Sequence, residues 1–300
     1  MQIIDAHVHA FSQLCGFGAD GELRAIGNGQ ARWSTGEIIN LMPPNLGDTS
    51  FPIESLLSLM DENQVEKAVL LQGGFLGFAN DYIYESITKY PMRLTGSATF
   101  DPWCRNAQKI LNNLLHTLHF RLFKFEMSTG CGIMGNHETF PLDHPVLMDF
   151  YAQIAEKQGV LIFDLGSPGD GSNQPKAIRQ IAERFPKMEI VICHLMSPRR
   201  NHRTELETGL LLMKKENIHF DLSALHWKVR PEQYPYPTAQ AFTRLAKDLV
   251  GSEHLMWGSD APSTLCQDSY EHLSGYLQEV FTDQEQDSVF YANANRLYFS

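Results

Sequence analysis

The sequence predicts a single-domain α/β protein that folds as a closed (β/α)₈ barrel, the TIM-barrel architecture. Short apolar runs alternate with longer amphipathic segments along all 300 residues. Strands that alternate with helices form parallel sheets through βαβ units, and eight such units favour a closed barrel over an open sheet. Hydrophobic residues make up 43% of the chain and charged residues 20%, a composition typical of a globular protein with a full core.

The elements follow from these runs in chain order. We expect eight strands, at residues 3–9, 67–72, 94–100, 121–127, 160–166, 190–195, 218–224 and 255–260. We expect helices between and after them, at residues 53–61, 82–90, 105–118, 145–157, 175–185, 202–215, 238–249, 268–280 and 283–297. Proline at a first helical position, as at Pro145 and Pro175, supports two of these helix starts.

The segment from about residue 11 to residue 52 is the longest one without a regular pattern, and it is rich in glycine and proline. A loop well beyond about 15 residues in a compact domain is usually functional or disordered. Because this segment follows a barrel strand, we expect a lid over the active site. The alternative is a mobile surface insertion.

Charge and cysteine content exclude several classes of function. The net charge of −11 argues against binding to nucleic acid or to an anionic membrane surface. The five cysteines are scattered and form no Cys-x-x-Cys motif, which indicates reduced thiols and a cytoplasmic protein. We find neither a signal-peptide pattern nor an apolar run of the roughly 20 residues that a membrane span needs. The expected partner is a small-molecule substrate.

Polar residues stand at the carboxyl ends of several predicted strands, where a barrel builds its active site. On the first strand, alternation places Asp5, His7 and His9 on one face. Each residue alone has a structural explanation, such as a hydrogen-bonded core histidine or a helix cap. Their coincidence at one end of the barrel instead favours a divalent metal with an open position for water. The other strand ends carry Asp164, His194, Asp260 and the pair Lys124 and Glu126.

The stretches "DAHVH", "CHLMSP", "WGSDAP" and "YANANRLYF" together resemble the amidohydrolase superfamily. The resemblance is to the branch that includes aminocarboxymuconate-semialdehyde decarboxylase and related lactone hydrolases, and it extends over most of the chain. It implies the same barrel and a divalent metal, most commonly Zn²⁺, bound by His7, His9 and Asp260. It also implies that Asp260 acts as general base and that His194 is catalytic or orients the substrate. Members often form dimers, so the resemblance also suggests a homodimer.

The sequence departs from this family pattern on the fifth strand. "FDLG" places Asp164 where the family has a histidine ligand. If Asp164 binds the metal, the added negative charge weakens the metal as a Lewis acid and favours Mn²⁺ over Zn²⁺. Otherwise Asp164 holds His194 or a water, or the metal is weakly bound or absent.

Glu126, Lys124 and Arg199 each keep more than one interpretation. Glu126 is either an additional metal ligand or the partner of Lys124 in a buried ion pair. Lys124 is either a substrate-binding or structural cation, or a carbamylated metal bridge. Arg199 either clamps a substrate carboxylate or lies in a solvated loop. Trp227 is a candidate wall of an apolar substrate pocket.

The favoured function is metal-dependent hydrolysis of a small-molecule amide, ester or lactone by metal-activated water. The first alternative is metal-dependent, non-oxidative decarboxylation of a small carboxylated substrate, which uses the same ligands. A closed apolar pocket favours decarboxylation, and an open polar mouth favours hydrolysis. The second alternative is a metal-free barrel that binds a ligand without turnover.

Overall fold

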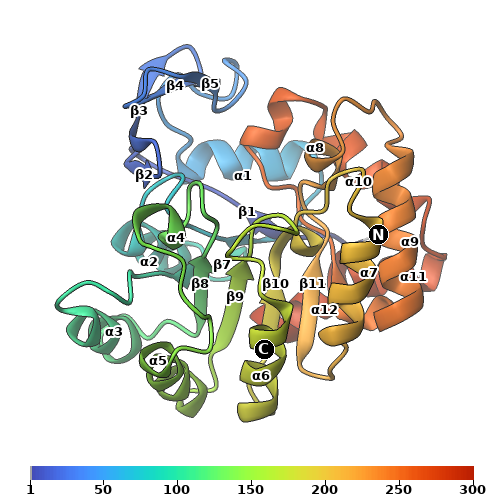
Figure 1. Ribbon diagram of the computed structural model, residues 1–300. Helices are drawn as coiled ribbons and strands as arrows, with labels where there is room; N and C mark the ends of the chain where they lie inside the picture. Colours follow the sequence, from blue (N-terminus) through green and yellow to red (C-terminus); the bar gives the residue numbers. More distant parts are fainter. Residues whose placement is uncertain (1) are drawn as a thin grey trace.

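The computed structural model describes residues 2–300 and confirms the closed barrel (Figure 1). Eight parallel strands pair in chain order, β1-β6-β7-β8-β9-β10-β11-β12. The last strand returns to the first, because Val8 forms a parallel bridge with Ala261 and the Ala6 amide donates to the Trp257 carbonyl oxygen at 3.1 Å. The strands are β1 (Ile4–Val8), β6 (Lys67–Leu70), β7 (Leu94–Ala98), β8 (Leu122–Glu126), β9 (Val160–Asp164), β10 (Ile190–Ile192), β11 (Ile218–Asp221) and β12 (Leu255–Met256).

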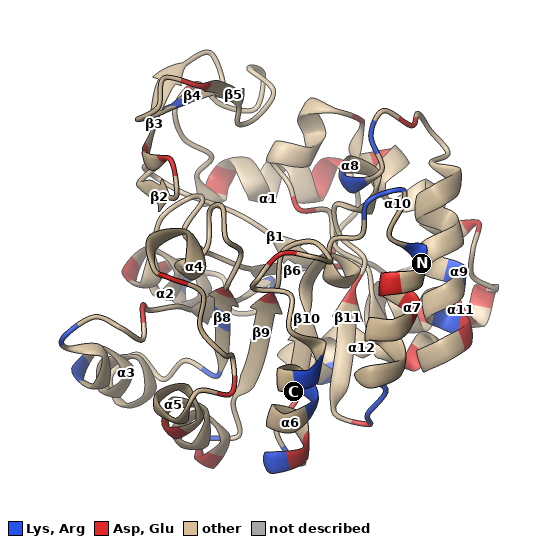
Figure 2. Cartoon of the chain, in the orientation of Figure 1, with Lys and Arg blue, Asp and Glu red and all other residues tan. Residues whose placement is uncertain are grey.

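Helices surround the strands and end close to the predicted boundaries. The helices that follow barrel strands are α1 (Ile53–Glu62), α2 (Asn80–Lys89), α3 (Ala107–His116), α5 (Pro145–Glu156), α6 (Pro175–Arg184), α7 (Arg203–Leu212) and α9 (Pro237–Val250). The chain ends in α10 (Tyr270–Gln278), α11 (Asp283–Asp287), a π-helical turn at 288–292 and α12 (Asn293–Tyr298). Two short helices, α4 (Ile133–Asn136) and α8 (Leu225–Lys228), lie in loops. Figure 2 shows basic and acidic residues on the helices and loops around the strands.

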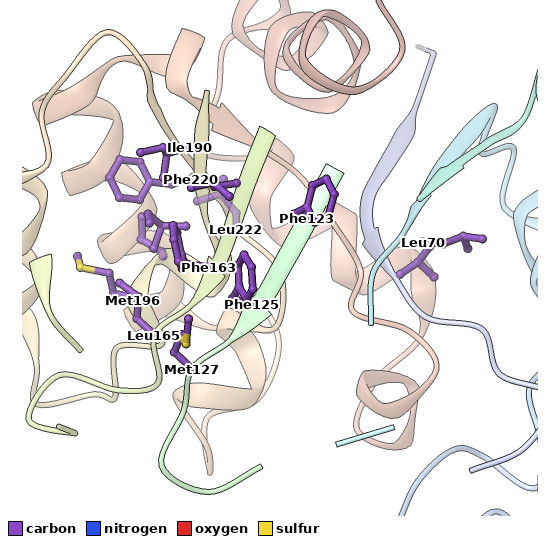
Figure 3. Packing of buried hydrophobic residues seen from close by; sticks show 14 of the residues in the cluster. Leu70, Phe123, Phe125, Met127, Phe163, Leu165, Ile190, Met196, Phe220 and Leu222 are labelled. Carbon is purple, nitrogen blue, oxygen red and sulfur yellow. The ribbon is translucent and has the colours of Figure 1, made fainter. Parts of the chain in front are cut away.

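Side chains of alternate strand residues form two packed layers. Phe123, Phe125, Phe163 and Phe220 point outward from β8, β9 and β11 toward the helices (Figure 3). The intervening residues, such as Leu122 and Ile162, fill the barrel interior together with residues of α12. The helix therefore contributes to the core at the amino-terminal end of the barrel. This leaves the carboxyl end for polar side chains.

A bulge in β1 corrects the expectation that Asp5 shares a face with His7 and His9. Asp5 pairs with Ala68, whereas Val8 pairs with Leu70, so three steps along β1 match two along β6. One extra residue reverses the side-chain alternation beyond it. Asp5 therefore points away from the two imidazoles.

We had expected the segment after β1 to be an irregular loop. It instead carries a four-stranded antiparallel sheet (Figure 1). Its strands are β2 (Gly16–Gly18), β3 (Gly21–Gly27), β4 (Gln30–Trp33) and β5 (Ile38–Asn40). Asn28 and Gly29 form the tight turn between β3 and β4 with φ values of 55° and 68°. An Asn-Gly pair between two alternating segments is the strongest short-range hairpin signal, and its presence here was the sign of a strand pair.

This small sheet supports the barrel mouth through the loops next to it. The Phe17 amide donates to the Gly74 carbonyl oxygen, and the Ala19 amide donates to that of Gly130, both at 2.8 Å. Gly74 belongs to the loop after β6 and Gly130 to the loop after β8. Both loops line the mouth pocket, whereas none of the described lining residues belongs to residues 11–52. The insertion thus packs against the loops that line the pocket and does not itself line it.

None of the helices within residues 2–300 combines the length and the apolar character that crossing a membrane requires.

Candidate metal centre

His7 and His9 stand at the carboxyl end of β1, and an acceptor fixes the proton of each ring. Nδ1 of His7 lies 2.9 Å from Oδ2 of Asp221, and Nδ1 of His9 lies 2.8 Å from the carbonyl oxygen of Leu71. A carbonyl and an ionised carboxylate only accept hydrogen bonds, so each Nδ1 carries the hydrogen. Each Nε2 therefore presents a lone pair, as in a histidine that binds a metal.

The carboxylate of Asp260 faces both lone pairs. Its Oδ1 lies 2.8 Å from Nε2 of His9 and 3.5 Å from Nε2 of His7. The His7 Nε2 is buried and has no hydrogen-bond partner among the described residues. Burial lowers the pKa of His7 to about 4, which keeps its ring neutral at pH 7. Three acceptor atoms thus converge with no donor between them, an arrangement that calls for a cation.

The spacing between His7 and Asp260 and the residue types of the centre fit a divalent metal. Bonds of about 2.0–2.1 Å at tetrahedral angles separate ligand atoms by about 3.4 Å, close to the His7–Asp260 distance. Two imidazoles and one carboxylate form a typical donor set for catalytic zinc with an open position. Asp221 supports it, because a carboxylate that accepts from Nδ1 orients the ring and raises the basicity of Nε2. Burial alone would raise the pKa of Asp221, but its contacts with His7 and His194 lower it below its usual range.

Asp5 forms hydrogen bonds with the segment that follows β12 and carries Asp260. Its carboxylate accepts hydrogen bonds from the Ser259 amide at 2.9 Å and from the Tyr270 hydroxyl at 2.7 Å. Oδ1 of Asp5, which accepts from the Ser259 amide, also accepts from the His7 amide at 3.2 Å. Asp5 thereby connects β1 to the segment after β12. It orients main chain at the metal centre instead of an imidazole.

His194 lies above His7, with ring centroids 4.7 Å apart. One ring nitrogen of His194 and one potential metal-ligand atom each of His7 and Asp260 all lie within 4.8 Å of one another. Residues 194–197 all have positive φ, between 49° and 65°, although none is glycine. Such a left-handed turn is strained and persists only where tertiary contacts hold it. Here the Asp221 carboxylate accepts from the His194 amide at 2.9 Å, so one carboxylate positions both His7 and His194.

Asp164 faces His194. Its Oδ2 lies 3.5 Å from Nε2 of His194, whose Nδ1 is 2.8 Å from the Ser223 hydroxyl. Burial opposes charge on both groups, but their mutual attraction lowers the pKa of Asp164 below its usual range and raises the pKa of His194. The structure therefore places Asp164 as a charged partner of His194. Neither Asp164 nor His9 belongs to the groups of described residues whose ligand atoms all lie within 4.8 Å of one another, which are His7, His194 and Asp260, and His7, Cys193 and Asp221.

Cys193 belongs to the second such group, with His7 and Asp221. Burial raises the pKa of its thiol well above the usual value, which keeps the thiol protonated. Because metals bind the thiolate, this group is a weaker candidate than the histidine–Asp260 set.

Lys124 and Glu126 both reach the barrel mouth from β8. Oε2 of Glu126 accepts from the Phe75 amide at 3.2 Å, so Glu126 holds the glycine-rich loop after β6. Burial raises the pKa of Glu126, and the charge of Lys124 partly offsets this effect. Burial would lower the pKa of Lys124, but the surrounding carboxylates of Glu126 and Asp164 raise it, so Lys124 remains a cation.

The candidate metal centre opens into a pocket of about 340 Å³ whose lining residues are mostly polar. Lys124, Glu126, Asp164 and Arg199 line it, whereas Trp227 is not among the lining residues. The Trp227 ring instead lies under the Arg230 guanidinium, 3.7 Å from its centroid. The adjacent Lys228 faces the pocket in its place. Residues that we had not predicted in the lining are Gly73, Phe75, Leu76, Ser128, Gly130, Cys131, Gly166, Ser167, Asp170 and Lys228.

His226 lies on α8 beside a cluster of tyrosines, with its ring centroid 5.5 Å from that of Tyr236 and 6.4 Å from that of Tyr276. Its side chain is buried, and its Nε2 has no hydrogen-bond partner among the described residues. Burial lowers the pKa of His226 from 6.5 to about 4. Protonation therefore favours the unfolded chain, so this contribution to stability is full above pH 6.5 and is lost as the pH falls toward 4.

We expect His226→Gln to reduce the loss of unfolding free energy between pH 7.5 and pH 5.0 by about 2 kcal/mol, because glutamine does not titrate. Urea unfolding at the two pH values measures this difference. The exposed His116 provides the control: His116→Gln leaves the pH dependence unchanged. An identical loss in wild type and His226→Gln would contradict the prediction.

Solved structures with the same fold cover almost the entire chain. A probable 2-pyrone-4,6-dicarboxylic acid hydrolase from Acinetobacter baumannii, with citric acid bound, is 19% identical, with a TM-score of 0.70 and 99% of each chain covered. An amidohydrolase from Burkholderia multivorans with bound zinc is 14% identical, with a TM-score of 0.72 and 99% of each chain covered. A 5-carboxyvanillate decarboxylase from Sphingomonas paucimobilis is 16% identical, with a TM-score of 0.58 and coverage of 81% of this chain and 82% of that one.

No curated protein matches the chain by sequence. The sequence model of the amidohydrolase family, in contrast, matches residues 4–299. This match spans the β1 histidines, Asp260 and every strand of the barrel. The chain therefore belongs to the amidohydrolase family, whose members include both hydrolases and decarboxylases.

Proposed function

We propose that the protein is a metal-dependent hydrolase that cleaves a lactone, ester or amide bond in a small carboxylated molecule. The observation that carries this proposal is the convergence of two imidazole lone pairs and one carboxylate oxygen. Oδ1 of Asp260 lies 2.8 Å and 3.5 Å from the Nε2 atoms of His9 and His7, with no donor between them. We propose Zn²⁺ as the metal, with Mn²⁺ as the alternative.

In this proposal His7, His9 and Asp260 hold the metal. A divalent cation there supplies Lewis acidity, which polarises a carbonyl group and acidifies water. The carboxylate of Asp260 accepts the proton of the attacking water and returns it to the leaving group. The imidazolium of His194, kept charged by Asp164, stabilises the negative charge that develops on the carbonyl oxygen.

The lining of the pocket supports an anionic substrate and hydrolysis. Lys124, Arg199 and Lys228 bring three cations to the mouth from β8, the loop after β10 and α8. Arginine and lysine are suited to bind carboxylates. Among the lining residues only Phe75 and Leu76 have large apolar side chains, whereas decarboxylation would be favoured by a closed apolar pocket. The similar structure with citric acid bound is consistent with carboxylate binding.

A paired assay tests the proposal. Protein purified without chelator is analysed for metal and then given dicarboxylated pyrones and aryl lactones, with acid release and CO₂ release both recorded. Hydrolysis is expected, and chelator should abolish it until zinc or manganese is restored. Release of CO₂ without ring opening would instead establish the decarboxylase alternative. A metal-free protein under metal-replete conditions would support the ligand-binding barrel and overturn the hydrolase.

Removing a mouth cation should weaken substrate binding more than turnover. We expect Arg199→Ala and Lys228→Ala each to raise KM for a carboxylated substrate by about tenfold, the loss of one charge-assisted hydrogen bond. The KM for an uncharged analogue should stay within twofold, as should both KM values in Lys109→Ala, a surface control on α3. Equal effects on charged and uncharged substrates would argue against carboxylate binding.

The role of Asp164 is decided by metal affinity. Because its carboxylate faces Nε2 of His194 at 3.5 Å, we expect Asp164→Asn to change metal affinity by less than threefold. The variant should also lower the pKa of His194, which NMR titration of the zinc-loaded protein measures. A loss of metal affinity of tenfold or more would instead identify Asp164 as a direct ligand, as its position in the family pattern suggests.

A further inference from the structure

A second cationic pocket lies at the amino-terminal end of the barrel, opposite the metal centre. It has a volume of about 500 Å³ and is formed by the residue before β8, the loops before β9 and β10, and the end of α12. Four cations line it, Arg121, Lys157, Lys187 and Arg296, which we call the basal cations.

The charge of this pocket is opposite to that of the protein as a whole. The chain has 35 acidic and 24 basic residues, and its net charge is −11. The basal pocket has four basic side chains and one acidic side chain, Glu189. Four like charges around one concave surface repel one another and create a local positive potential that attracts anions.

Glu189 offsets only part of the charge of the basal cations: burial would raise its pKa, but His219 and, less strongly, the nearby Arg296 lower it. Its Oε2 accepts a hydrogen bond from Nε2 of His219 at 2.8 Å, so the carboxylate is turned toward the start of β11. Arg121 donates to the main-chain oxygen of Ser300. Within residues 2–300, the charged groups of Lys157, Lys187 and Arg296 form neither an ion pair nor a side-chain hydrogen bond. Lys157 and Lys187 are therefore free to bind a ligand, whereas the charge of Arg296 is partly offset by Glu189.

Helix termini explain only half of this cluster. Lys157 directly follows α5 and Arg296 lies in the last turn of α12, where a cation favours the helix dipole. Arg121 and Lys187 instead lie in loops that lead into β8 and β10. Cations from both kinds of position meet in one pocket.

We propose that the basal cations form a binding site for a small phosphate-bearing molecule. Guanidinium groups match phosphate oxygens in pairs, and ammonium groups add point charges around them. The pocket is large enough for a phosphate together with a small organic group, and its position separates it from the substrate pocket. This site is independent of the reaction proposed for the metal centre.

Calorimetric titration with inorganic sulfate tests the site, since sulfate mimics phosphate and leaves the metal in place. Titrations are made on the metal-loaded protein at constant ionic strength. We expect a saturable sulfate site that is weakened at least tenfold in Lys187→Glu and in Lys157→Glu and is distinct from any binding at the barrel mouth. Two variants should retain wild-type affinity within twofold, namely Lys109→Glu on the surface of α3 and Lys228→Glu at the barrel mouth.

Three results would overturn the proposal. The first is wild-type protein without saturable binding. The second is an equal loss in Lys109→Glu and Lys187→Glu, which would indicate nonspecific screening by the overall charge. The third is loss of binding in Lys228→Glu with retention in Lys187→Glu, which would place the anion at the barrel mouth. Melting curves of each variant without sulfate verify that the barrel is folded.

Discussion

The His7→Ala variant is expected to lose its metal, and its kcat should fall at least a thousandfold. His7 contributes an Nε2 that is buried, unprotonated and without a hydrogen-bond partner among the described residues. Its removal leaves His9 and Asp260 as a two-ligand site, which is too few for tight binding of zinc. Without the metal, neither the carbonyl nor the water is activated. Elemental analysis after dialysis and steady-state kinetics measure the two losses.

A milder variant separates loss of the metal from loss of the fold. Asp221→Asn retains the shape of the side chain but removes the charge that holds Nδ1 of His7, and should lower metal affinity about 10- to 100-fold. His116→Ala, at the exposed end of α3, is the control and should retain one metal per chain. A His7→Ala protein that is folded, fully loaded with metal and active would refute the proposed centre.

The Asp260→Asn variant is expected to lower kcat by about 10²- to 10⁴-fold at saturating metal, the usual contribution of a general base. Burial would raise the pKa of Asp260, but its contacts with His9, His194 and His7 lower it below its usual range. The carboxylate is therefore ionised and able to accept a proton. Asparagine tolerates the positive φ of 59° at this position, so the main chain should be preserved.

Two measurements test whether this effect comes from proton transfer. The KM of Asp260→Asn should remain within about threefold of wild type, because the mouth cations that bind substrate are intact. The exposed Asp248→Asn on α9 serves as the control for loss of one carboxylate. Turnover within tenfold of wild type in metal-saturated Asp260→Asn would assign the base to another residue.

The strand ends could be located from the sequence because they depend on local pattern. An apolar run that ends in a titratable residue marks the carboxyl end of a barrel strand, and parallel strands bring these ends together. His7, His9, His194 and Asp260 were found in this way, and the structure brings them to one mouth. The adjacent residues Asn28 and Gly29 also predict a hairpin turn, although we had interpreted the surrounding segment as a loop.

Other features of the site depend on contacts between segments far apart in the chain. The bulge that turns Asp5 away from the histidines arises from the pairing of β1 with β6, which alternation within β1 does not reveal. The left-handed turn at 194–197 relies on a carboxylate from β11, at Asp221. Lys228 reaches the pocket from a short helix with no distinctive pattern.

The sequence by itself determined the order of strands and helices, the family, and the residue types at the mouth, because each depends on local periodicity or on short motifs. Only the tertiary structure decided which nitrogen of each histidine carries a proton, since this is set by Asp221 and by the carbonyl of Leu71. It likewise decided that Asp164 faces His194 and that four cations meet at the base of the barrel. These relations arise when packing brings distant residues within a few ångströms, and no pattern of neighbouring residues encodes them.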